Sequence, residues 1–139
     1  MNWQEIDIYV VRPDGTSVYD AKANALKEVS KQDLRALAGT QAFAREAPVN
    51  LIYVADLSRV RGRVTEGTMM TVGADTGFIS QNVYLFCASE GLSTVVRGSV
   101  DKKALGEALG LRENQRIILG QSVGYPAAAA TGAQAGRRE

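Results

Sequence analysis

Three arginines at alternate positions are the first side chains in this sequence that could do chemistry. Arg59, Arg61 and Arg63 stand in the run Arg-Val-Arg-Gly-Arg, and an extended segment would point all three to one side. Three cations on one side could bind the phosphate of a nucleotide. We favour the simpler interpretation of a solvated loop, because charged residues are mostly exposed.

The chain contains no histidine and a single cysteine, which excludes several classes of site. Without histidine there is no Ser-His-Asp or Cys-His nucleophile, no His-ligated zinc or iron site and no histidine general base. Cys87 lies in the apolar run Tyr84–Ala88, so we interpret it as a small buried hydrophobic residue. The carboxylates Asp56, Asp75 and Glu90 are scattered, and their spacing predicts neither a paired-carboxylate site nor a divalent-metal site.

The composition is that of one globular domain without a strong charge. The 139 residues include 16 Lys and Arg against 15 Asp and Glu, and 45% of the residues are hydrophobic. A net charge of +1 provides no broad positive field, so we expect no nucleic-acid partner. No stretch approaches the ~20 apolar residues of a membrane span, and the N-terminus does not resemble a leader, so we predict a cytoplasmic protein without membrane contact.

Hydrophobic periodicity and turn residues define the elements that must position any site. The predicted elements of the first half are a hairpin of strands 5–11 and 16–20, helical turns at 33–38 and 41–46, and a central strand at 49–55 covered on both faces. Those of the second half are a helix at 75–92, a strand at 94–96, a helix that Asp101 caps and Gly110 ends, and a strand at 115–124. We expect a loop or lid at 59–70.

The helix predicted at 75–92 has apolar residues on almost every side, and therefore must be buried on almost every side. In so small a domain the simplest cover is a second subunit, so we infer a homodimer. We assign Trp3, Phe78 and Tyr84 to the core. Strands and helices alternate without a regular βαβ rhythm, which favours an α+β fold over 1–126, followed by a flexible tail at 127–139.

Four segments, in order, resemble the C-terminal half of the nitroreductase family. They are Asp75–Leu85, Gly91–Thr94, Asp101–Leu111 and Val123–Pro126. The shared pattern is a long buried helix ending in Ala-x-x-Gly-Leu, a short strand, a capped helix ending in Leu-Gly-Leu, and a strand closing in Gly-Tyr-Pro. Met1–Gln4 resembles the family's Ser-x-x-Asn-x-Gln segment. Within the family the pattern is most similar to the thiazoline-oxidase-like dehydrogenases.

The resemblance implies a homodimer that binds FMN between its subunits and passes electrons from NAD(P)H to a small-molecule acceptor. It also implies a mixed, largely antiparallel sheet flanked by helices, with a long buried central helix. Asn2 and Gln4 correspond to side chains at the edge of the flavin pyrimidine, and on an extended segment both amides can point the same way. The alternative is that they are terminal polar residues in solvent.

The resemblance also assigns a role to Val96, Arg97 and Gly98, which match the family's backbone turn against the reactive flavin nitrogen. Gly98 would permit close approach of the ring, and Arg97 would stabilise charge on the reduced ring. A plain surface arginine after a strand is the alternative for Arg97.

One part of the family pattern is missing from this sequence. Family members carry an Arg-x-Ser-type motif that grips the FMN phosphate, in a helix ahead of the Asn-x-Gln segment. Arg137 and Arg138 resemble basic residues that some relatives place on the same phosphate. We expect either that Met1 is not the true start or that this is a truncated relative with weakened or absent FMN binding.

Two classes of function therefore follow. The first is an FMN-dependent, NAD(P)H-linked oxidoreductase of the nitroreductase type, with a nitroaromatic, quinone-like or heterocyclic substrate. The second is a non-enzymatic fragment that keeps the fold and the dimer surface and binds no flavin. A nucleic-acid module is a distant third, because it rests only on the arginines of 59–63.

Overall fold

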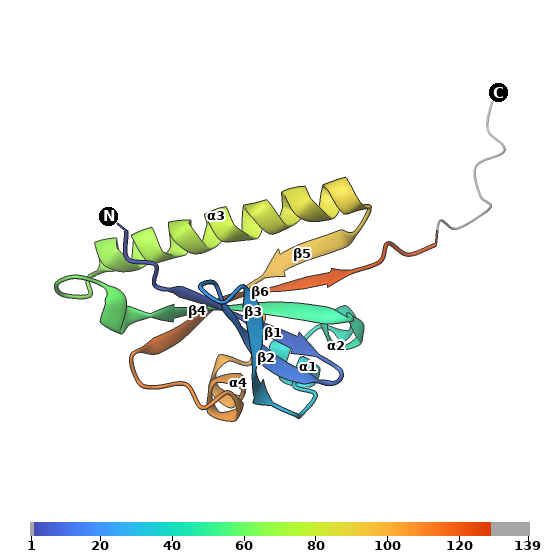
Figure 1. Cartoon of the computed structure of the whole chain (residues 1–139), viewed down its shortest axis with the longest axis horizontal. Helices are drawn as coiled ribbons and strands as arrows, with labels where there is room; N and C mark the ends of the chain where they lie inside the picture. The colour runs from blue at the N-terminus through green and yellow to red at the C-terminus, as the bar shows by residue number, and fades with distance from the viewer. Residues whose placement is uncertain (1, 129–139) are drawn as a thin grey trace, which may run out of the picture.

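The computed structural model describes residues 2–128, and their helices and strands lie in three layers (Figure 1). In chain order the elements are β1 (Ile6–Arg12), β2 (Gly15–Asp20), β3 (Ala25–Ser30), α1 (Arg35–Ala38), α2 (Ala42–Glu46), β4 (Val49–Asp56), the 3₁₀ turn η1 (Leu57–Arg59), α3 (Glu66–Glu90), β5 (Ser93–Arg97), α4 (Lys102–Ala108) and β6 (Gln115–Gly124). The long helix α3 covers one face of the sheet, and α1, α2 and α4 lie on the other. Most of the tail predicted from residue 127 lies outside the described residues, as do Arg137 and Arg138.

The six strands form one sheet in the order β3-β2-β1-β4-β6-β5, and all neighbouring strands are antiparallel. The predicted hairpin is confirmed, with Arg12 opposite Gly15 at its turn. The predicted strands at 49–55 and 115–124 are β4 and β6, and β4 pairs with β6 along its whole length, with one shift of register between Tyr53 and Val54. The α+β class with a largely antiparallel sheet is therefore confirmed.

Strand β4 divides the core in two, because its side chains alternate between the faces of the sheet. Ile52 and Val54 are fully buried on the side of α1 and α4, where they lie in one cluster with Leu105. Ala55 is buried on the opposite side, in a cluster with Val72 of α3. The prediction of a central strand covered on both faces is confirmed.

A polar network also lies inside the core, between β4 and α3. Tyr53 Oη donates to Gln121 Oε1 (2.5 Å), and Gln121 Nε2 donates to Thr94 Oγ1 (3.0 Å) and to the carbonyl oxygen of Ser80 (3.4 Å). Burial raises the pKa of the Tyr53 phenol far above its usual value, so the hydroxyl remains a donor. The network joins β4, β5, β6 and α3 at one point.

Helix α3 begins at Glu66, nine residues before the predicted start, so residues 66–70 are not part of a loop. Thr65 and Thr68 form a capping box: the Thr68 N–H donates to Thr65 Oγ1, and the Thr65 N–H donates to Thr68 Oγ1, both at 3.2 Å. Glycine and threonine are weak helix formers and are frequent in the first turns of α3. Helix propensity therefore did not predict that the helix starts at Glu66. Gly91 ends the helix in the left-handed conformation, with φ 67°.

Only one stripe of α3 is buried within the chain, formed by Val72, Thr76, Ser80 and Cys87. Its large apolar residues Met70, Phe78, Leu85 and Phe86 are 59–74% exposed. The prediction that the helix is buried on almost every side is therefore wrong for the single chain, and so is the assignment of Phe78 to the core. In residues 2–128, no helix combines the length and apolar character needed to cross a membrane.

Strand β3 was not predicted from the sequence. Five of its six residues are exposed, so they carry no alternation of apolar and polar types. The strand is held through its backbone pairing with β2, for example at Val18 opposite Lys27. It forms one edge of the sheet, opposite the edge formed by β5.

Candidate functional site

The N-terminal segment and helix α3 enclose a hollow of about 400 Å³. The residues lining it are Asn2, Trp3, Gln4, Glu5, Ile6, Asp75, Phe78 and Ile79. Both side chains predicted for the flavin edge, Asn2 and Gln4, are therefore brought to one open space, although Met1 lies outside the described residues. A hollow of this size is within the usual range for small-molecule sites, which is roughly 300–1,000 Å³.

The segment that lines the hollow is bent and firmly attached. Gln4 has φ 51°, in the left-handed region, so the expected extended geometry is wrong at this residue. Arg59 Nη1 donates to the carbonyl oxygen of Gln4 (3.0 Å), and the same guanidinium makes two bonds of 2.9 Å to Asp7. The Asp56 N–H donates to the carbonyl oxygen of Glu5 (2.8 Å). Residues that adopt sparsely populated conformations cluster at functional sites.

Glu5 is a buried carboxyl group beside a second carboxyl group. It is only 2% exposed, and its Oε1 has no hydrogen-bond partner within residues 2–128. Burial raises the pKa of Glu5, and the neighbouring Asp75 carboxyl raises it further. Trp3 Nε1 is a second buried polar atom without a partner in the described part of the chain.

The turn after β5 points toward the end of the sheet where β1 starts, and the register places Arg97 level with Tyr9, three residues beyond the start of β1, with β4 and β6 between them. Val96 and Gly98 do not line the hollow. The Val96 N–H donates to the hydroxyl of Tyr84 on α3 (2.8 Å), which protects this edge of the sheet. Gly98 is exposed, and a side chain added there would meet nothing within 4 Å.

Arg97 is 8% exposed, so the interpretation as a surface arginine is wrong. Its guanidinium turns to the face of the sheet opposite α3, where it donates to Asn50 Oδ1 (2.5 Å), Ser122 Oγ (3.1 and 3.2 Å) and the carbonyl oxygen of Ala38. Ser122 Oγ in turn donates to Asn50 Oδ1 (2.7 Å), and Asn50 Nδ2 donates to the carbonyl oxygen of Ala44 (2.7 Å). Burial lowers the pKa of Arg97, yet a guanidinium remains charged in proteins.

Two glycines leave the space that this guanidinium occupies. A Cβ on Gly39 would lie 2.7 Å from Arg97 Nη1 and 2.4 Å from Ala44 Cβ. A Cβ on Gly120 would lie 3.0 Å from the same nitrogen. Gly39 has an extended backbone, with φ −166°, which any residue can adopt. A glycine is needed there because a side chain would collide with its neighbours, and not because of its backbone conformation.

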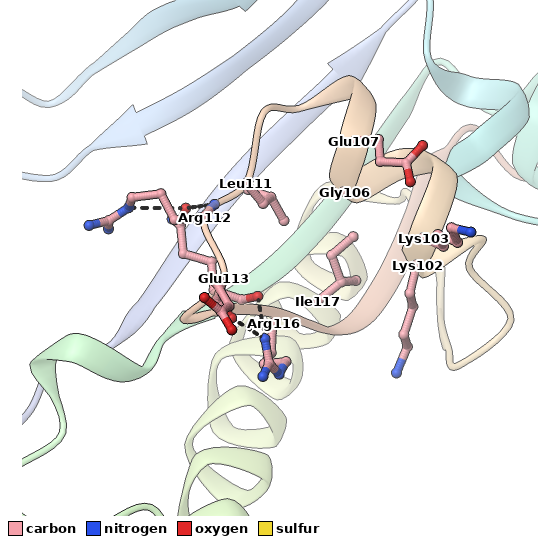
Figure 2. A pocket seen from close by; sticks show the side chains of 10 residues that line it. Lys102, Lys103, Gly106, Glu107, Leu111, Arg112, Glu113, Arg116 and Ile117 are labelled. Carbon is pink, nitrogen blue, oxygen red and sulfur yellow. Dashed lines mark hydrogen bonds between the residues drawn. The ribbon is translucent and has the colours of Figure 1, made fainter.

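A third group of charged residues surrounds a hollow of about 550 Å³ beside α4 (Figure 2). It is lined by Lys102, Lys103, Gly106, Glu107, Leu111, Arg112, Glu113, Gln115, Arg116 and Ile117. Arg112 is paired with Asp56 (2.6 Å), and Arg116 donates to the carbonyl oxygen of Glu113. Cations and carboxylates share the rim, so this hollow has no single charge to select a ligand.

The three arginines of 59–63 do not act as one group, so the alternative interpretation as a phosphate-binding stripe gains no support. Arg59 is bound to Asp7 and to the backbone of Gln4, whereas Arg61 and Arg63 are exposed, as expected for a solvated loop. The polar residues that the sequence did not indicate are Glu5 and Asn50. A single buried polar residue carries no periodic signal, so only tertiary structure reveals it.

The Arg97 network gives a first testable prediction. Arg97→Met should lower the free energy of unfolding by about 2–4 kcal/mol, because it leaves several buried acceptors without donors. The unfolding free energy of Arg97→Lys should lie between those of Arg97→Met and the native chain, because a lysine ammonium cannot reach all of the buried acceptors. Urea denaturation would measure both, with the exposed Arg45→Met as the matched control. Equal midpoints for Arg97→Met and Arg45→Met would contradict the assignment.

The raised pKa of Glu5 gives a second prediction, for stability against pH. A carboxyl whose pKa is higher in the folded chain contributes stability that is complete below its unfolded value near 4.5 and is lost as the pH rises through the folded value. The difference in unfolding free energy between the native chain and Glu5→Gln should therefore fall with rising pH and then level off. Denaturation at a series of pH values measures it, and a difference that rises with pH would refute the assignment.

Comparison with known proteins agrees with this architecture. A family model described as "Nitroreductase family" matches residues 1–125. The NADPH-flavin oxidoreductase of Vibrio harveyi is 33% identical over 106 residues, which are 69% of this chain and 43% of that protein. A solved protein of Ralstonia eutropha JMP134, described as a nitroreductase, is 36% identical with a TM-score of 0.81, covering 88% of this chain and 59% of that one.

A second solved relative shows a similar fold at lower identity. The NADPH:FMN oxidoreductase of Vibrio harveyi, complexed with NAD+, gives a TM-score of 0.65 at 24% identity over 91% of this chain and 53% of that one. The chain thus spans between two fifths and three fifths of the length of these relatives. Because the family model covers nearly the whole described chain and the fold agrees, the chain belongs to the nitroreductase family.

Proposed function

We propose that this chain is a flavin-dependent oxidoreductase of the nitroreductase type, which uses FMN and NAD(P)H with a nitroaromatic, quinone-like or heterocyclic substrate. The observation that carries the proposal is the hollow formed by Asn2–Ile6 and α3, where the segment expected at the flavin edge lines open space. The names of the Vibrio harveyi relatives, which include NADPH, flavin and FMN, support it. The thiazoline-oxidase-like subgroup and a cytoplasmic location stay predictions from the sequence.

The residues of the hollow fit the ring system of a flavin. Asn2 and Gln4 supply amide donors and acceptors, and Phe78 and Ile79 supply apolar surface. When bound, the flavin would supply the transfer of two electrons, while the chain binds and orients it. The lining contains no cationic side chain and two carboxyl groups, so it does not fit the phosphate of FMN.

The turn after β5 is the second proposed contact with the flavin. Gly98 leaves its backbone open to close approach, which supports the role proposed for Val96–Gly98. The Val96 N–H already donates to Tyr84, so a backbone donor at this turn has to come from the residues that follow. Arg97 is a positioning residue in this scheme, because its guanidinium holds the turn against α1 and β4 from the far face.

Flavin titration tests the proposed function. The native chain should bind riboflavin and FMN with affinities within about threefold of each other, because no cation in the hollow meets the phosphate. Asn2→Ala and Gln4→Ala should each weaken binding about tenfold, the usual size of a lost hydrogen-bonding side chain. The exposed Gln32→Ala is the matched control. Absorbance and fluorescence would report binding, and anaerobic NADPH should bleach the bound flavin.

Two results would count against this function. Absence of flavin binding at millimolar flavin would favour the non-enzymatic alternative, in which only the fold and the dimer surface are kept. Flavin that binds but is not reduced by NADPH or NADH would leave a flavin-binding protein without the proposed electron donor.

We also propose that a second copy of the chain covers α3. The exposed side chains of Met70, Phe78, Leu85 and Phe86 are too apolar for a free surface, since large exposed apolar patches mark interaction sites. An apolar hollow of about 390 Å³ lies beside them. It is lined by Val49, Leu51, Ile79, Asn82, Val83, Phe86, Cys87 and Val123.

Light scattering tests this dimer. Phe86→Glu should convert a dimer into a monomer at micromolar concentration, because it places a charge in the apolar contact. Phe43→Glu changes an exposed aromatic residue of α2, on the face of the sheet opposite α3, and should leave the mass unchanged. A native chain that is monomeric at high concentration would refute the proposal.

A further inference from the structure

Residues 2–5 precede β1 and lie beside helix α3, and three of their features work against this bound position. Gln4 adopts the left-handed region, with φ 51°, which residues other than glycine rarely occupy. Trp3 Nε1 and Glu5 Oε1 are buried and have no hydrogen-bond partner within residues 2–128. Buried polar groups are nearly always paired, because an unpaired one is costly. The contacts that hold the segment must therefore offset these costs.

The contacts that hold the segment reach three elements. Two hydrogen bonds to its backbone carbonyl oxygens, described above, attach it to η1 and β4. The Trp3 side chain packs on the apolar cluster that contains Val72 of α3. The last contact is made by the Glu5 carboxyl group, which is 2% exposed and faces the Asp75 carboxyl group of α3.

The contact between Glu5 and Asp75 depends on a proton. A protonated carboxyl group can donate a hydrogen bond to an ionised one, so a pair that holds one proton is attractive. A pair that holds no proton places two negative charges side by side, away from water. Burial and the neighbouring Asp75 accordingly raise the pKa of Glu5.

The charged groups around Glu5 do not remove this dependence. Arg59 of η1 acts on Glu5, but its guanidinium already makes two bonds of 2.9 Å to Asp7 of β1. The backbone N–H of Asp56 on β4 bonds to Glu5, and the Asp56 carboxylate is paired with Arg112 (2.6 Å). The cations of this region are therefore already bound to other carboxylates.

We propose that residues 2–5 form a pH-sensitive strap: the strap lies against α3 while Glu5 and Asp75 hold one proton between them, and it leaves α3 when that proton is lost. Release gives the ionised Glu5 access to water, frees Gln4 from the left-handed region and lets Trp3 Nε1 bind water. Because the strap lines the hollow beside α3, pH then controls whether this hollow is closed or open, whichever ligand it takes.

Trp3 is the only tryptophan of the chain, so its fluorescence reports the position of the strap. As the pH rises from 4.5, the ordinary value for a glutamate, to about 9, acrylamide should quench this fluorescence more strongly and the emission should shift to longer wavelength. The midpoint should lie above 4.5. Hydrogen exchange of the Asp56 N–H should accelerate over the same range more than that of amides in the middle of β4, because its acceptor on Glu5 leaves.

Two variants should hold the strap against α3 at every pH in this range. Glu5→Gln carries a neutral amide that can donate to Asp75, and Asp75→Asn carries an amide that can donate to an ionised Glu5, so both should lose the transition. Glu28→Gln on the exposed strand β3 is the matched control and should keep the native midpoint. Circular dichroism would verify that each variant is folded.

Three results would overturn the inference. They are a native chain whose Trp3 quenching does not change with pH, a transition that persists in Glu5→Gln or Asp75→Asn, and a transition in which circular dichroism shows the whole chain unfolding. The measurements use the chain without added flavin. A strap that responds as expected in a chain that binds no flavin would therefore support this inference and count against the proposed function, and the opposite pair of results would do the reverse.

Discussion

The half of the molecule opposite α3 depends on a buried positive charge that has no carboxylate partner among residues 2–128. The Arg97 guanidinium can remain there only if neutral oxygens surround it, because an unpaired charge in the interior is costly. Those oxygens come from the end of α1 and from facing positions of β4 and β6. The short helices α1 and α2 bury few residues of their own, so this network fixes where they lie on the sheet.

The two faces of the central strands are thus stabilised in different ways. On one face, Asn50 and Ser122 accept hydrogen bonds from the guanidinium. On the other face, the hydrogen bonds of Tyr53 and Gln121 join the strands to α3. If β4 slipped by one residue against β6, each of these polar side chains would point to the opposite face of the sheet, into the apolar cluster there. The register of β4 against β6 is therefore set by polar pairs as well as by apolar packing. Strand β5 pairs with β6, so the same register also places the turn after β5 that we assign to the flavin.

Local patterns predicted most of the elements, and long-range contacts explain the errors. The hairpin, β4, β6 and the Asp101 cap of α4 depend on residues close in sequence, and all are confirmed; the Ala104 N–H donates to Asp101 Oδ1 at 3.0 Å. Strand β3 is held only by backbone pairing, which leaves no hydrophobic pattern to detect. For α3, periodicity showed an apolar helix but not which sides the chain covers. Neither interpretation of Arg97 anticipated its burial, because its acceptors lie up to 59 residues away.

The space that Gly39 and Gly120 leave for the guanidinium also has an evolutionary consequence. Both residues lack a side chain where Arg97 Nη1 comes within about 3 Å of the position a Cβ would take. Loss of the arginine alone would not admit a side chain at 39, because Ala44 Cβ would still lie nearer to its Cβ than the arginine does now. At 120 the remaining neighbours are ends of side chains, Val100 Cγ2 at 3.0 Å and Ile52 Cδ1 at 3.4 Å, which can shift. A larger residue acquired at 120 after that loss would exclude an arginine at 97, so the order in which these two positions change constrains which descendants can recover the network.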